Sequence, residues 1–275
     1  MTPRTSASQP SISSPNAATG IGNRAAASRN AMSTQGESGL EPVAKNASGL
    51  VLPNFANMLA PAVKGMTLSP NGNPAAAKAV LEKAGFVLGS DGYFKDKSGR
   101  KLTLQITDPA SFSDYAEDDA LAAAALRKAG IDATFVGQSV TAWSSDLATG
   151  NFQLSMHWSQ TSISPYQLYN NWLNSALATN NANGNFERLR NPTIDGLLAK
   201  LAGATTPAEQ MRYLAPIETF VATDVPIIPT VYGAAFDEYN TSNFTGWPTA
   251  SNPYESGSPN APTNEVVVLH LQPSA

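Results

Sequence analysis

Helix and strand signals alternate along residues 101–158, and this alternation constrains the fold more than any other feature of the chain. Residues 101–108 (KLTLQITD) alternate apolar and polar side chains, as a half-buried strand does. The pattern then predicts a helix over 115–129, a strand over 131–137, a helix over 141–149 and a strand over 152–158. Strands and helices joined by short links in this order are typical of an α/β protein with a parallel or mixed sheet.

Cap residues predict three more helices. Asn73-Pro74 begins a helix that stops at Gly85, and Asn191-Pro192 begins another. Thr206 to Glu209 forms a capping box before a third helix, which Pro216 should kink. The remaining predicted elements are a small hairpin around 91–99, an edge strand over 225–232 and a last strand over 265–271.

Composition excludes several functions. The net charge is −4 and no cluster of Lys and Arg is present, which argues against a nucleic-acid binder. No cysteine occurs, so thiol nucleophiles and thiolate metal sites are absent. No apolar run approaches the ~18 residues of a membrane span, and the N-terminus lacks the apolar core of a secretory signal. As written, the chain has no export route, which leaves a cytoplasmic location as one alternative.

Residues 1–48 contain hardly a large apolar side chain and are rich in Ser, Ala, Asn, Thr and Gly. Such a segment cannot bury enough surface to offset its ordering entropy, so we expect it to be disordered. The rest is expected to form one lobe over 49–235 and a separate C-terminal segment over 236–275.

The stretch from Gln153 to Trp172 (QLSMHWSQTSISPYQLYNNW) has the composition of a pocket wall. Aromatic faces supply contact area, amides and hydroxyls supply hydrogen bonds, and ligands in α/β sheets lie beyond the carboxyl ends of the strands. The predicted ligand-binding residues are Trp158, Gln160 and Thr161 at the strand end and Tyr166, Asn170 and Asn171 beyond the proline.

Chemistry for catalysis is sparse. The two histidines, His157 and His270, have no second ligand near them in sequence, so neither a metal nor a cofactor is predicted. There is no nucleophile elbow and no glycine-rich phosphate loop. The acids at 114 and 117–119 are interpreted as solvent-facing residues that complement a helix dipole. Binding is therefore favoured over catalysis.

From residue 73 onward the chain resembles the family 5 extracytoplasmic solute-binding proteins of ABC transporters, which bind oligopeptides, dipeptides or oligosaccharides. The ordered segments that carry the resemblance are NPAAAKAVLEKAGF, SDGYFKDKSGRKLTLQI, LRKAGIDATF, FERLRNPTIDGLLAKL and VPIIPTVY. The resemblance implies the C-terminal lobe of a two-lobed, clamshell binding protein of type II, with a mixed sheet flanked by helices. It also implies a monomer outside the membrane that delivers a small solute to permease subunits.

The resemblance also implies that most of the first lobe of that family is missing from this chain. The residues RNAMS at 29–33 resemble the start of a family helix, but TQGESG follows where the family continues A-I-D-R. These observations favour a truncated, frame-shifted or interrupted gene product. The segment over 236–275 would then cross back to the missing lobe.

The substrate signal lies after Trp158. Peptide binders of the family often carry W-x-[AG]-D-Y-x-D-P there, whereas this chain places Thr161 and Ser164 at the acidic positions. A buried peptide ammonium without a carboxylate is costly. Peptide and oligosaccharide are both kept as substrates. The rival interpretations are a non-functional fragment and a carbohydrate-active enzyme, the latter disfavoured because no acid occurs between Leu147 and Phe186.

Overall fold

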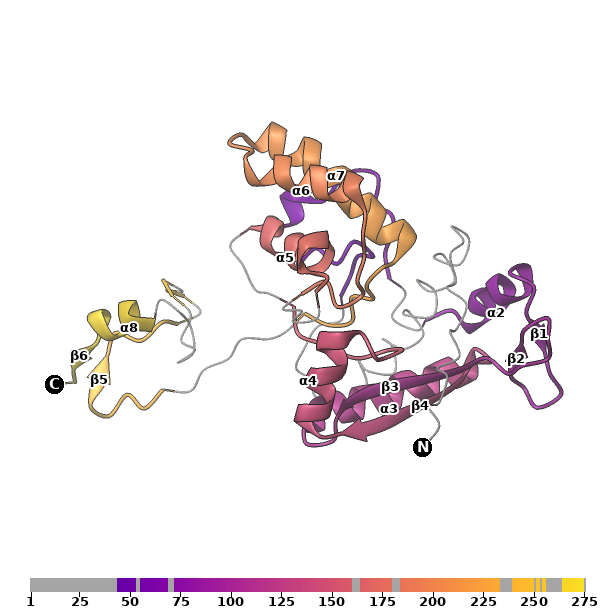
Figure 1. Cartoon of the computed structure of the whole chain (residues 1–275). Coiled ribbons are helices and arrows are strands. Elements are labelled where there is room, and N and C mark those ends of the chain that lie inside the picture. Colours follow the sequence, from indigo (N-terminus) through magenta and orange to yellow (C-terminus); the bar gives the residue numbers. More distant parts are fainter. Residues whose placement is uncertain are drawn as a thin grey trace, which may run out of the picture. The chain divides into compact units, whose positions relative to one another are not determined.

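The computed structural model describes residues 44–52, 55–68, 72–159, 164–179, 184–232, 239–249, 251–252, 254–255 and 264–274. The chain divides into a large unit that ends at Tyr232 and a small unit that begins at Gly233. The large unit contains two hydrophobic cores, one around a pair of parallel strands and one among helices. Figure 1 shows the elements of both units along the chain.

Two parallel strands, β3 (Thr103–Pro109) and β4 (Asp132–Gln138), form the centre of the first core. They pair in register from Thr103 opposite Asp132 to Pro109 opposite Gln138, and α3 (Ser113–Lys128) connects them. A parallel pair needs such a crossover, because a tight turn can join only antiparallel strands. The buried residues of this core are Leu81, Phe94, Ile106, Ala122, Ala123, Leu126, Ile131 and Ala133.

Smaller elements flank the strand pair. The helix α2 (Pro74–Lys83) begins at Asn73, whose side chain accepts a hydrogen bond from the Ala76 N–H, as predicted. The predicted hairpin consists of β1 (Val87–Leu88) and β2 (Phe94–Lys95), paired antiparallel. The helix α4 (Val140–Thr149) follows β4 and stops at Gly150, where the backbone turns left-handed with φ of 74°.

The second core is helical. It contains α5 (Pro165–Leu173), α6 (Pro192–Ala202), α7 (Pro207–Asp224) and the short 3-10 helices η2 (Ala56–Met58) and η3 (Ser175–Leu177). Figure 1 shows α6 and α7 side by side with α5 next to them. The predicted caps at Asn191 and Thr206 are confirmed, including both hydrogen bonds of the capping box, and α7 continues through Pro216.

Residues 44–52 and 55–66 cover this helical core. The phenolic oxygen of Tyr232 accepts a hydrogen bond from the Lys45 N–H (3.1 Å) and donates one to the Leu50 carbonyl (3.2 Å). The Ala60 N–H donates to the carboxylate of Glu218, which is fully buried (2.6 Å). Residues 44–48 therefore belong to the folded unit, and the predicted disordered segment was too long at its end. Residues 1–43 lie outside the described residues.

Two of the strands predicted after residue 200 are wrong. Residues 225–232 form no strand in the described part of the chain, since Pro226 and Pro229 have no N–H for a ladder. Residues 265–271 lie largely in a helix, α8 (Asn264–His270), in the small unit. A short apolar run without polar alternation is compatible with either a buried strand or a helix.

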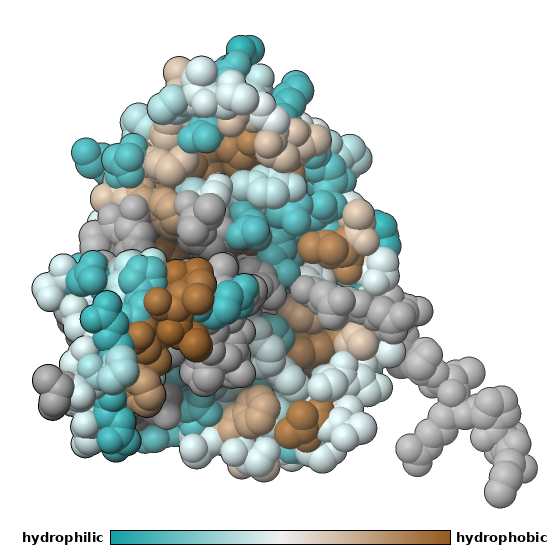
Figure 2. Space-filling view, turned by 90° about the vertical axis from the view of Figure 1, so that its left-hand side faces the viewer, coloured by the Kyte–Doolittle hydropathy of each residue, from teal (hydrophilic) through white to brown (hydrophobic). Residues whose placement is uncertain are grey.

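The small unit also contains β5 (Phe244–Thr245) and β6 (Gln272–Pro273), paired antiparallel. It exposes several apolar side chains, with 82% of Leu269, 63% of Val268 and 45% of Phe244 accessible. In Figure 2, brown hydrophobic patches interrupt the teal and white surface. No helix among the residues described here is long and apolar enough to cross a membrane.

Candidate functional site

The segment that carries the predicted site begins beside β3 but does not continue as a strand. The Thr107 N–H donates to the Leu154 carbonyl (2.9 Å) and the Leu154 N–H donates to the Gln105 carbonyl (3.2 Å). This pairing is an isolated parallel bridge between Ile106 and Leu154. The predicted strand over 152–158 is therefore wrong.

Asp108 explains why the pairing stops. Its carboxylate accepts a hydrogen bond from the Met156 N–H (2.8 Å) and another from the Ser155 hydroxyl (3.2 Å). A side chain at the end of β3 thus binds the Met156 N–H, a main-chain group with which a third strand would have continued the ladder. This contact depends on a residue 47 positions earlier in the chain, and so periodicity within 152–158 could not reveal it.

The two residues after Met156 enter an aromatic stack formed by Trp143, His157, Trp158 and Phe186. The His157 ring lies 5.5 Å from Trp143, nearly parallel to it at 16°. It also lies 4.0 Å from Trp158 and 4.5 Å from Phe186, measured between ring centroids. Trp143 is buried, whereas 54% of Trp158 is exposed. The stack is therefore buried at Trp143 and exposes the indole of Trp158 to solvent.

His157 serves this stack as a neutral ring. Burial lowers the pKa of His157 below its ordinary value of 6.5. Its Nδ1 lies 2.6 Å from the Trp158 carbonyl, and because a carbonyl only accepts hydrogen bonds, Nδ1 carries the proton. The prediction that His157 lines a pocket or fills the core is consistent with this position between three aromatic rings.

The predicted residues on α5 are organised by the helix itself. The Asn170 amide oxygen accepts hydrogen bonds from the Tyr166 hydroxyl (3.3 Å) and from the Asn174 amide (2.8 Å). The Asn171 carbonyl accepts one from the Asn185 N–H (2.6 Å). Tyr166, Asn170 and Asn171 are all partly buried, so each of them reaches the surface of α5.

One contact joins α5 to the segment that carries Trp158. The Trp172 indole donates a hydrogen bond to the hydroxyl of Ser159, the residue after Trp158. Ser164 caps α5 by accepting from the Tyr166 N–H (3.2 Å). The described residues of the predicted site thus form two neighbouring groups, the aromatic stack and the polar face of α5. Gln160 and Thr161 lie outside the described residues.

The acidic run on α3 was misinterpreted in part. Asp118 and Asp119 are 6% and 1% exposed, so they do not face solvent, and Asp108 is completely buried. Burial raises the pKa of Asp119 to about 9, and the neighbouring charges of Asp108 and Asp118 add to this. Burial also raises the pKa of Asp108. Asp118 and Asp119 stand four residues before the buried Ala122 and Ala123, on the same face of α3, and this spacing was the signal that could have indicated burial.

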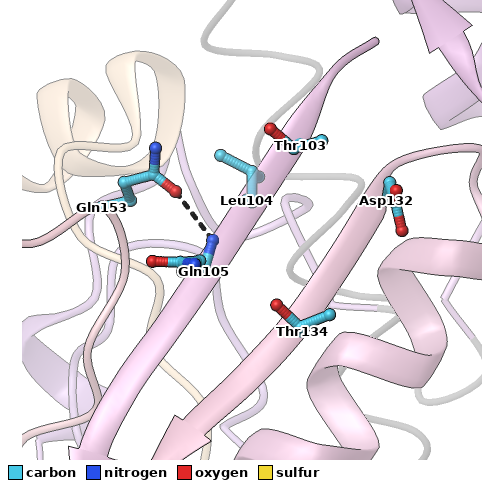
Figure 3. A pocket seen from close by; sticks show the side chains of 6 residues that line it. All are labelled: Thr103, Leu104, Gln105, Asp132, Thr134 and Gln153. Atoms are coloured by element: carbon cyan, nitrogen blue, oxygen red, sulfur yellow. Dashed lines mark hydrogen bonds between the residues drawn. The ribbon is translucent and has the colours of Figure 1, made fainter.

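A shallow pocket opens at the other end of the strand pair (Figure 3). The Gln153 side-chain oxygen accepts a hydrogen bond there from the Gln105 N–H (2.7 Å). It takes the place of the main-chain carbonyl that a neighbouring strand would offer to Gln105. The pocket is polar and offers no aromatic face, so it is a poorer candidate for a solute than the aromatic stack. It is lined by Thr103, Leu104, Gln105, Asp132, Thr134 and Gln153. Within the described ranges, no three His, Cys, Asp or Glu side chains are grouped to hold a metal ion.

The sequence profile of the bacterial extracellular solute-binding proteins, family 5 (middle region), matches residues 23–180. The chain belongs to this family. The family 5 assignment confirms the resemblance described above, and its match spans β3, β4, α5 and three members of the aromatic stack, Trp143, His157 and Trp158. No protein among the curated sequences matches this chain.

Solved structures agree with the family 5 fold. A periplasmic oligopeptide-binding protein of an oligopeptide ABC transporter from Thermotoga maritima is 22% identical, with a TM-score of 0.81 over 92% of this chain and 49% of that protein. A second structure of it, bound to mannohexaose, has a TM-score of 0.78 with the same identity and coverage. The oligopeptide-binding protein AppA from Bacillus subtilis, in complex with a nonapeptide, is 16% identical, with a TM-score of 0.64 over 92% of this chain and 47% of AppA.

These similarities confirm the α/β, periplasmic-binding-protein-like fold class. The chain spans about half the length of the solved structures that it matches.

Proposed function

We propose that this chain binds a solute for an ABC importer outside the membrane, without catalysis, and that the solute contacts the exposed face of Trp158. The observation that supports the proposal is the aromatic stack. An indole with 54% of its surface accessible is held against His157, and a buried tryptophan lies behind it. Aromatic faces that are rigid before binding lose little entropy when a ligand packs on them.

We propose an oligosaccharide as the first solute to test and a peptide as the second. Sugars offer apolar C–H faces for an indole and hydroxyl groups for amides and hydroxyls, which Tyr166, Asn170 and Asn171 supply nearby on α5. Thr161 and Ser164 provide no carboxylate for a peptide ammonium. Gln160 and Thr161 remain proposed contacts on the basis of sequence alone.

The chain would act as one lobe of a two-lobed protein, working as a monomer with permease subunits. The exposed apolar residues of α8 and β5, Leu269, Val268 and Phe244, are the surface that we propose packs against the other lobe. A single lobe encloses a ligand on one side only, so the affinity should be lower than that of a closed clamshell.

Titration calorimetry of the full chain with mannohexaose, cellohexaose and a set of tri- to pentapeptides tests the proposal. We expect a hexaose to bind, and Trp158→Ala to weaken that binding by about tenfold or more, equal to ~1.4 kcal/mol. Trp247→Ala is the matched control, since this indole in the small unit stacks on Tyr239 at 4.7 Å. Peptide binding insensitive to Trp158→Ala would contradict the proposed site, and a folded chain that binds nothing would favour a fragment without function.

A further inference from the structure

The buried acid Asp108 lies directly beneath the aromatic stack. It stands one residue before the end of β3, and its side chain is 0% exposed. Burying a carboxyl group costs free energy unless the group is hydrogen-bonded. An apolar side chain would fill the same space without this cost, so we expect the carboxyl group of Asp108 to have a role of its own. Its two oxygens are used by two consecutive residues of one segment, Ser155 and Met156.

These two hydrogen bonds restrict the residues that follow. One holds a main-chain N–H and the other a side-chain hydroxyl, so both position and rotation of the segment are fixed just before His157. The Ser155 hydroxyl also accepts a hydrogen bond from Nε1 of Trp143 (2.9 Å), the indole that stacks on His157. The base of the stack and the segment that carries its exposed member are therefore both tied to Asp108.

A second buried acid supports the first. The side chain of Asp119 on α3 interacts with the carboxyl group of Asp108. Its Oδ2 is buried and meets no N–H or O–H donor among the described residues. Two adjacent carboxylates without solvent cannot both be charged, so one proton lies between them. A protonated Asp119 donates to Asp108 and leaves the Asp108 oxygens as acceptors for Ser155 and Met156.

We propose that Asp108, supported by Asp119, is the positioning residue of the solute site: its carboxyl group fixes Ser155 and Met156 and thereby sets where the Trp158 indole stands. The inference rests on the proposed function, because Trp158 is there the contact to the solute. Asp108 touches no solute itself and acts through the segment that it holds.

The charged neighbours of this acid pair are few. Asp118 on α3 is the other acid that acts on Asp119, and His157 is the titratable group on the segment above. Trp143 on α4 and Ser155 contribute neutral hydrogen-bonding groups. Loss of the shared proton therefore adds negative charge beside Asp118, and the hydrogen bonds between Asp108 and the segment should weaken at high pH.

Two spectra and one titration test the proposal on the full chain. Near-ultraviolet circular dichroism reports the packing of Trp143 and Trp158, far-ultraviolet circular dichroism reports the fold, and calorimetry gives the Kd for mannohexaose. We expect Asp108→Ala to lose most of the near-ultraviolet tryptophan signal and to raise the Kd about tenfold or more. Asp108→Asn should retain much of both, since its amide can accept from Met156 and donate to Ser155. Glu117→Gln changes an exposed acid on α3, the helix of Asp119, and should change neither the near-ultraviolet signal nor the Kd.

Asp119→Asn separates positioning from general stability. Its amide donates to Asp108 at every pH, so its near-ultraviolet signal should persist to pH 10, whereas the wild-type signal should fall as the pH passes about 9, where Asp119 loses its proton. Equal pH profiles for the two proteins would overturn the role of Asp119. If Asp108→Ala fails to fold, Ser155→Ala removes only the hydroxyl between Asp108 and Trp143, and an unchanged signal in that variant would overturn the role of Asp108.

Failure of this inference differs from failure of the proposed function. A wild-type chain that binds no sugar and no peptide refutes solute binding, while the spectra of Asp108→Ala still decide whether Asp108 positions the indole. A chain that binds mannohexaose through Trp158, with Asp108→Ala unchanged in spectrum and Kd, refutes the positioning role alone.

Discussion

Nε1 of Trp172 donates a hydrogen bond of 3.0 Å to Oγ of Ser159. This bond joins the second turn of α5 to the residue that follows the exposed indole of Trp158. It is the contact through which the two halves of the proposed site, one aromatic and one polar, are held next to each other. Its energy should therefore appear in ligand binding as well as in stability.

A double-mutant cycle with Trp172→Phe and Ser159→Ala measures that energy. A net hydrogen bond of this kind contributes about 0.5–1.5 kcal/mol, so the coupling between the two substitutions should lie in this range. We expect it in urea unfolding and again in the affinity for the best ligand. Additive effects in both measurements would show that the two residues act independently.

Gly49 should not tolerate a side chain. Its φ is 76°, and a Cβ there would lie 2.6 Å from Cη2 of Trp172 and 2.9 Å from Cγ of Pro229. We expect Gly49→Ala to destabilise the protein by roughly 2–4 kcal/mol, through backbone strain and overpacking together. The matched control is Gly65→Ala, where a Cβ meets no atom within 4 Å. Denaturant midpoints that shift equally for both variants would contradict this account.

Glu218 should make stability depend on pH. Burial raises the pKa of Glu218 from 4.5 to about 7, so the folded protein keeps a proton that the unfolded chain loses. The stabilisation from this proton is fully present below pH 4.5 and is lost as the pH rises to about 7. Glu218→Gln cannot titrate and still accepts from the Ala60 N–H, so its stability relative to wild type should rise between pH 5 and pH 8.

Urea unfolding at both pH values measures this difference. Glu82→Gln, on the exposed side of α2, is the control and should follow the wild type at each pH. A Glu218→Gln variant that parallels the wild type across the range would mean that Glu218 is ionised in the folded protein.

The capping box of α7 offers a test of local stability. The Thr206 hydroxyl accepts from the Glu209 N–H (3.3 Å), and the Glu209 carboxylate accepts from the Thr206 N–H (3.2 Å). Thr206→Ala should cost about 1 kcal/mol of unfolding free energy. Thr205→Ala is the neighbouring control, because its main-chain N–H still donates to Glu209. Thermal melts in which Thr205→Ala is the more harmful change would contradict the assignment of the cap.

Helix starts were predictable because their causes are local. The Asn73, Asn191 and Thr206 side chains bond main-chain groups two or three residues away, and such pairs are visible in sequence. The alternation that predicted β3 and β4 has the same local character. Trp158, one of the predicted contacts, is exposed and the neighbouring Ser159 contacts α5, whereas solute binding by the predicted residues stays a prediction.

What sequence could not supply were relationships between distant residues. No residue near Ser155 in sequence indicates that Asp108 ends the strand pairing there. No residue near Asp119 in sequence indicates that its side chain contacts the buried Asp108. The run at 265–271 has no alternation to separate strand from helix, and the helix α8 forms from residues that suit either. Periodicity uses only residues that are neighbours in sequence, whereas the structure of these segments depends on contacts with residues far away in the chain.

The covering segment over 44–52 and 55–66 has a consequence for synthesis. Its hydrogen-bond partners include Tyr169, Glu218 and Tyr232, and Ala60 leaves the ribosome 158 residues before Glu218 does. At a translation rate of ~5–20 residues per second, Glu218 is synthesised roughly 8–30 s after Ala60, and until then the segment lacks this partner. During that interval its apolar residues stay available to chaperones and proteases. The part of the helical core that is made first is thus the last to be completed, and slowing translation before residue 218 should lower the yield of folded protein.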